Sequence, residues 1–107
     1  MATQGLVTVM SGKKVLMKVV AGSEGYNAKE VAAELKNKWP VSADQAYQIA
    51  EEIGFGCVDC LVVITETETK FEGCEELGHL YQDTFQKPKF NPRWEQGIAD
   101  HVVVIKV

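Results

Sequence analysis

Two consecutive stretches of the chain carry signals for where a helix begins and ends. In the first stretch, Asn27 is a capping residue and Glu30 stands three positions later. Tyr26 and Val31 occupy the two positions of a hydrophobic staple. Pro40 ends the stretch, because a residue that precedes a proline is disfavoured in helical conformation. The sequence therefore predicts a capped first helix that stops just before Pro40.

The second stretch repeats this pattern after a short break. Ser42 is the capping residue and Gln45 stands at the third helical position, so the two can form a capping box. Gly54 follows the last apolar residue, as expected for a helix end. Four residues share one face of this predicted helix at helical spacing: Ala46, Ile49, Ala50 and Ile53.

Strand-like segments lie on both sides of the two predicted helices. Residues 6–10 and 14–21 are rich in β-branched residues and are joined by Ser11-Gly12, which predicts a hairpin. Residues 57–64 are apolar on both faces in their second half, which is typical of a central strand. This strand is expected to continue as the alternating polar segment 65–68.

The remaining residues complete the predicted order of elements. A third helix is expected from about Phe71 to Phe85, followed by an irregular segment fixed by Pro88 and Pro92. Residues 101–107 are expected to form the last strand. The prediction is a single α+β domain over residues 1–107, a two-layer sandwich of order ββααβαβ. Its sheet would have about four mostly antiparallel strands, with the helices packed on it.

Charge and composition exclude several classes of function. The formal net charge of the 107-residue chain is −4, which disfavours binding to nucleic acid or to an anionic membrane. The second predicted helix exposes three carboxylates and no basic residue, so it is not a DNA-recognition helix. No apolar run approaches the roughly 20 residues of a membrane span, and no signal peptide is apparent. Three cysteines without such a signal indicate reduced thiols and a cytoplasmic protein.

The single arginine of the chain lies in an aromatic, proline-containing segment. A guanidinium offers a flat, permanently charged fork that binds carboxylates or phosphates and stacks on indoles. We therefore expect residues 86–97 to form a recognition loop for a protein or a small anionic ligand. The alternative is that the arginine only holds the loop onto the protein's own acidic residues. The candidate ligand-binding residues are Lys87, Lys89, Phe90, Arg93 and Trp94.

His79 is the strongest candidate for acid–base chemistry. Glu76 and Asp83 stand three and four residues from it, so on a helix a carboxylate can lie beside the imidazole and raise its pKa. A small enzyme or small-molecule binder would use this group together with Arg93. The plainer interpretation is a solvated histidine on an acidic helix. The pair Cys57 and Cys60 opens a strand, where the two thiols point to opposite faces, so neither a metal nor a cofactor is expected.

The last predicted strand suggests self-association. Five of its seven residues are valine or isoleucine, and Lys106 is its only lysine or acidic residue. Such a strand left open at the edge of a sheet promotes aggregation, so it should be central or paired across a homodimer. The sequence as a whole favours a small cytoplasmic binding or accessory protein, homodimeric, over an enzyme.

Overall fold

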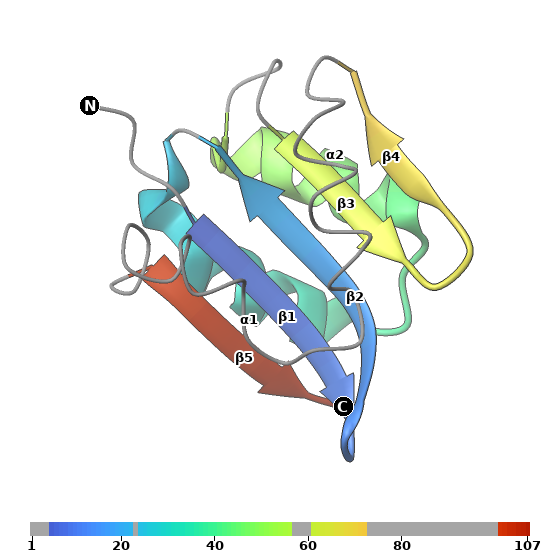
Figure 1. Ribbon diagram of the computed structural model, residues 1–107. Coiled ribbons are helices and arrows are strands. Elements are labelled where there is room, and N and C mark those ends of the chain that lie inside the picture. Colours follow the sequence, from blue (N-terminus) through green and yellow to red (C-terminus); the bar gives the residue numbers. More distant parts are fainter. Residues whose placement is uncertain (1–4, 23, 57–60, 73–100) are drawn as a thin grey trace.

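The computed structural model in Figure 1 describes residues 5–22, 24–56, 61–72 and 101–107. Its elements follow one another in a simple order. They are β1 (Gly5–Ser11), β2 (Lys14–Ala21), the short 3-10 helix η1 (Gly25–Asn27), α1 (Ala28–Lys38), α2 (Ala43–Ile53), β3 (Leu61–Thr65), β4 (Thr69–Phe71) and β5 (Val102–Lys106).

The strands form one five-stranded sheet in the order β4-β3-β2-β1-β5. Neighbouring strands are antiparallel except for β5, which runs parallel to β1. Helices α1 and α2 pack side by side on one face of this sheet (Figure 1). The predicted α+β two-layer arrangement is confirmed, with five strands in place of about four.

The hairpin predicted at Ser11-Gly12 is present. β1 and β2 pair from Gly5 with Ala21 to Ser11 with Lys14. Gly12 has a positive φ of 61°, a left-handed conformation that glycine adopts without strain. The register shifts once, between Val9 and Met10, so the strand bends there without losing its partner.

The main core lies between the sheet and the two helices. Alternate residues of β1, β2 and β3 point toward the helices, as strand geometry requires. They meet the apolar faces of α1 and α2, and the side chains in this cluster are almost completely buried. The cluster includes Val7, Val9, Met17, Val19, Val31, Leu35, Ala46, Tyr47, Ala50, Phe55 and Val63.

The second helix begins and ends as the sequence predicts. The Ser42 hydroxyl accepts a hydrogen bond from the Gln45 backbone N–H at 3.1 Å, and Gln45 Oε1 accepts one from the Ser42 N–H at 2.8 Å. Gly54 closes the helix with a φ of 85°, and its N–H donates to the carbonyls of Ala50 and Glu51. The capping box therefore satisfies backbone donors that the first helical turn leaves unpaired.

The start of α1 differs from the prediction. Asn27 makes no capping hydrogen bond, because η1 runs directly into α1 and holds Asn27 at φ −93° and ψ 25°. Its amide Nδ2 instead donates to the carbonyl of Ile53 at 3.1 Å, which ties the start of α1 to the end of α2. Tyr26 is 59% exposed, so the predicted staple with Val31 is also wrong. The end of α1 before Pro40 is as predicted.

The segment after β3 corrects two further predictions. β3 ends at Thr65, where the Thr65 hydroxyl accepts a hydrogen bond from the Glu68 N–H at 3.1 Å and tightens a turn. The chain then returns as β4, so the predicted extension 65–68 belongs to the strand only at Thr65. Phe71 pairs with Val62 in this new hairpin and does not begin a helix. Residues 73–85 of the predicted third helix and the Cys57–Cys60 pair lie outside the described residues.

Among the described strands, the last one occupies an edge of the sheet and not its centre. β5 pairs only with β1 among the described strands, with Val104 opposite Thr8 in a parallel register. The prediction that it is central is therefore wrong, and the alternative of pairing across a homodimer stays open. Neither helix in the described part of the chain is long and apolar enough to cross a membrane.

Candidate functional site

The residues that the sequence singles out for binding or catalysis fall outside the part of the chain that the structure describes. The recognition loop and the histidine with its two carboxylates therefore stay predictions. These residues are Lys87, Lys89, Phe90, Arg93 and Trp94 in the loop, and Glu76, His79 and Asp83 in the predicted helix.

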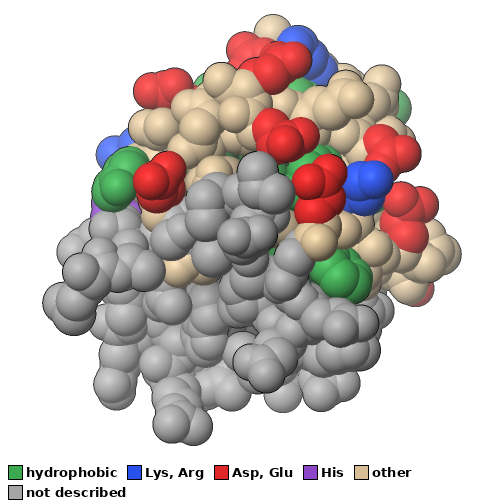
Figure 2. Space-filling model, turned by 90° about the horizontal axis from the view of Figure 1, so that it is seen from above, with side chains coloured by type: hydrophobic (Ala, Val, Ile, Leu, Met, Phe, Trp, Pro, Cys, Tyr) green, Lys and Arg blue, Asp and Glu red, His purple; other side chains and the backbone are tan. Residues whose placement is uncertain are grey.

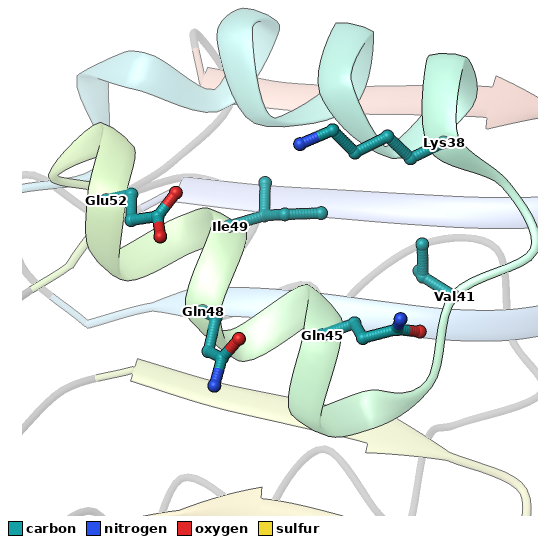
Figure 3. Close-up of a pocket in the computed structure, with 6 residues that line it drawn as sticks. All are labelled: Lys38, Val41, Gln45, Gln48, Ile49 and Glu52. Carbon is teal, nitrogen blue, oxygen red and sulfur yellow. The ribbon is translucent and has the colours of Figure 1, made fainter.

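A groove of about 220 Å³ lies between α1 and α2 on the described surface (Figure 3). It forms because α1 ends at Lys38 and the chain crosses to α2 through the short connection 39–42. The residues that line it are Lys38 from α1, Val41 from the connection, and Gln45, Gln48, Ile49 and Glu52 from α2.

The floor of the groove is apolar and belongs to the core. Ile49 is only 8% exposed, and Val41 packs as a partly buried residue against the same cluster. Both side chains are fixed by the packing beneath them, so the floor is already formed. A preformed apolar floor lowers the ordering cost of binding.

The rim of the groove is polar. Figure 3 shows the Lys38 side chain running alongside α1 from its last turn, while Ile49 and Glu52 extend from α2. The Gln45 side chain is held in place by the capping box, since its Oε1 accepts from the Ser42 N–H. Gln48 is exposed. An apolar centre inside a polar rim is the usual anatomy of a protein contact site.

The charge of this rim is negative where it is not already neutralised. Lys38 Nζ lies 3.2 Å from Glu34 Oε2, so its charge has a partner within α1. Glu52 makes no ion pair with any other described residue. Seen from above the view of Figure 1, the charged side chains on the described surface are mostly carboxylates (Figure 2). The charge at the groove therefore favours a positively charged binding group.

A second hollow of about 210 Å³ lies at the start of β5. It is lined by Tyr26, Ala28, Lys29, His101 and Val103 among the described residues. The rings of Tyr26 and His101 meet edge to face, with centroids 6.3 Å apart and planes at 85°. This contact links η1 to the residue that precedes the edge strand.

Tyr47 is a buried residue with an unusual environment. It is 1% exposed, and its hydroxyl has no hydrogen-bond partner among the described residues. Burial raises its pKa above the ordinary 10.0, and the nearby carboxylates of Glu72 and Glu51 raise it further. Lys70 Nζ lies 5.9 Å from the centre of the Tyr47 ring and 3.3 Å from Asp44 Oδ1. The lysine thus holds β4 against α2.

Sequence reasoning overlooked a polar pair on the other face of the sheet. Thr8 and Lys18 are register partners in β1 and β2, and both are completely buried. Their neighbours on that face form an apolar cluster that includes Leu6, Met10 and Val20. Lys18 takes part in an interaction there and is not without a partner. The available signal was a lysine between Met17 and Val19, in a run that is otherwise apolar from Val15 to Ala21.

The described residues contain no group of three or more histidine, cysteine or acidic side chains arranged to hold a metal ion. What they offer is a shallow, preformed groove with an apolar floor, together with an exposed sheet edge. No known protein family, curated protein or solved structure matches this chain.

Proposed function

We propose that this protein is a small binding protein that recognises another protein. In this proposal the α1–α2 groove takes up one apolar side chain from a basic segment of the partner. The observation that carries it is the fixed apolar floor of Ile49 and Val41, enclosed by a rim whose unneutralised charge is the Glu52 carboxylate.

The size of the groove favours a side chain over a free metabolite. Pockets for small molecules usually measure about 300–1,000 Å³ and enclose most of the ligand. At about 220 Å³ the groove is smaller and open to solvent, which suits a single leucine- or methionine-sized group. Such pockets commonly hold the anchoring residue of a protein–protein interface.

The charge pattern favours basic residues on both sides of that anchor. Asp44, Glu51 and Glu52 are exposed on α2, which has no basic residue in its last turn. Asp44 is paired with Lys70, whereas Glu52 lines the groove and has no ion-pair partner among the described residues. A lysine beside the anchoring side chain would approach the Glu52 carboxylate and increase the rate of association. The predicted loop of residues 86–97 is proposed as a second part of the recognition surface.

A titration with a synthetic peptide of alternating leucine and lysine tests this proposal. We expect the backbone amide signals of Val41, Gln48 and Ile49 to shift in nitrogen-15 NMR spectra. A peptide of alternating leucine and glutamate serves as the control and should leave these signals unchanged. Adding salt should weaken the interaction, because the charges at the rim are exposed to solvent.

A matched pair of variants separates the groove from general acidity. Glu52→Lys reverses the charge at the groove, whereas Glu30→Lys makes the same change on an exposed position of α1 that does not line it. We expect Glu52→Lys to raise the dissociation constant of the leucine–lysine peptide about tenfold, which corresponds to about 1.4 kcal/mol of binding free energy. Glu30→Lys should change the affinity far less. Equal losses in the two variants would show that net charge, and not the groove, attracts the peptide.

A further inference from the structure

The exposed large apolar side chains of the described residues all lie along one edge of the molecule. Tyr26 is 59% exposed, Val104 is 47% exposed and Val107 is 43% exposed. Val104 is in β5, Val107 follows it directly, and Tyr26 contacts His101 just before it. Exposed apolar groups that gather in one place mark an interaction surface more often than scattered ones do.

Among the described strands, only β1 pairs with the backbone of β5. The N–H of Val107 donates to the carbonyl of Met10 at 2.9 Å, so Val107 points its backbone groups toward β1. Because the direction alternates along a strand, Val103 and Ile105 do the same. The N–H and C=O groups of Val102, Val104 and Lys106 therefore point away from β1. No other described strand pairs with them.

The opposite edge of the sheet shows how an edge is usually protected. β4 has only three residues, and its central residue is Lys70. Short length and a central charge both discourage another strand from pairing. β5 is longer, contains Val102, Val103, Val104 and Ile105 in succession, and pairs with β1 without a bulge. Among the described residues, this edge has neither the short length nor the central charge of β4.

We propose that β5 pairs antiparallel with β5 of a second copy of this chain, about a two-fold axis through Val104. In this register Val104 lies opposite itself, and Val102 lies opposite Lys106 of the other copy. All of these residues present outward backbone groups, and each such pair exchanges two hydrogen bonds. About six hydrogen bonds then join two five-stranded sheets into one continuous sheet.

The side chains fit this register as well as the backbone does. The two Val104 side chains meet at the axis, where β-branched pairs stabilise a sheet. The aliphatic part of each Lys106 lies beside Val102 of the other copy. The two Lys106 residues stand four strand positions apart, about 14 Å, which exceeds the screening length in physiological salt. Their repulsion is therefore small.

Sedimentation equilibrium over a range of protein concentrations gives the first test. The expected mass is twice the 11.8 kDa of the single chain. A mass of one chain at every concentration up to the solubility limit would overturn the proposal.

Substitutions at Val104 test the register. Val104→Pro removes an outward N–H and leaves the hydrogen bonds to β1 in place, so we expect a folded monomer. Val104→Thr keeps the N–H and the branched shape and should remain a dimer. Val104→Lys places two like charges at the axis and should also give a monomer. If the proline variant does not fold, the lysine variant alone tests the register. Dimers of unchanged affinity in either the folded proline variant or the lysine variant would overturn the proposed pairing.

Discussion

Thr8 and Lys18 face each other across β1 and β2, and neither side chain reaches solvent. The Thr8 hydroxyl has no hydrogen-bond partner in the described part of the chain, and an apolar cluster covers the same face of the sheet. A buried polar group without a partner costs about 1–3 kcal/mol relative to one that is satisfied. Much of that cost should disappear when an apolar group of the same shape replaces the hydroxyl.

We therefore expect Thr8→Val to raise the free energy of unfolding by about 1 kcal/mol, as measured by urea denaturation. Thr65→Val is the matched control. The Thr65 hydroxyl accepts from the Glu68 N–H and donates to the Glu68 carbonyl, so its loss should destabilise the protein. A destabilised Thr8→Val protein would show that the hydroxyl has a stabilising role.

The raised pKa of Tyr47 predicts how the free energy of unfolding changes at high pH. Its pKa is raised in the folded protein, first by burial and then by Glu72 and Glu51, so the folded state holds the phenol proton more tightly than the unfolded state. Below pH 10 both states are protonated and the group contributes no pH dependence. Above pH 10 the unfolded state ionises first, and stability falls as the pH rises toward the folded-state pKa.

We expect Tyr47→Phe to lose this part of the alkaline decline. The difference in unfolding free energy between the variant and the wild type should grow in favour of phenylalanine above pH 10. Near neutral pH the variant should be as stable as the wild type or slightly more so, because no described residue forms a hydrogen bond with the removed hydroxyl. Parallel stability curves from pH 8 to 11 would contradict this assignment of the proton.

The capping box of α2 offers a third prediction. Ser42→Ala removes the acceptor for the Gln45 N–H and should lower the free energy of unfolding by about 1 kcal/mol. Asn27→Ala tests a different contact, since Asn27 makes no capping bond and instead donates to the Ile53 carbonyl. Hydrogen exchange should show a looser first turn of α2 in the Ser42 variant and a looser end of α2 in the Asn27 variant.

The predicted recognition loop is tested by a double substitution. Replacing Arg93 and Trp94 by alanine should weaken capture of an anionic or protein ligand, while the melting temperature stays close to that of the wild type. Lys36→Ala, at an exposed position of α1, serves as the control for loss of a positive charge. A large loss of thermal stability in the double variant would show that these residues hold the fold together.

The elements with strong local signals were predictable from the sequence. The Ser11-Gly12 hairpin and the Ser42–Gln45 capping box depend on residues that are close in the chain, and the structure contains both. The start of α1 was not predictable in the same way. Asn27 has the chemistry of a cap, but its amide is used by the Ile53 carbonyl, which lies 26 residues further along the chain.

Contacts between distant residues explain the other errors. Phe71 fits a helical pattern by spacing, yet it pairs with Val62 because the turn at Thr65 and Glu68 sends the chain back along β3. The parallel pairing of β5 with β1 places the ends of the chain's described part side by side, and no local signal encodes that partner. The groove was missed for a similar reason. Lys38 and Ile49 are 11 positions apart and meet only when α1 packs on α2.

Hydrogen exchange along β5 tests most directly whether the chain pairs with itself. The amides of Val103, Ile105 and Val107 point toward β1 and should be protected in either case. The amides of Val102, Val104 and Lys106 point outward, so they are protected only when another strand pairs with them. We predict slow exchange at all six amides at concentrations where the dimer forms. Fast exchange confined to the three outward amides at those concentrations would contradict the pairing.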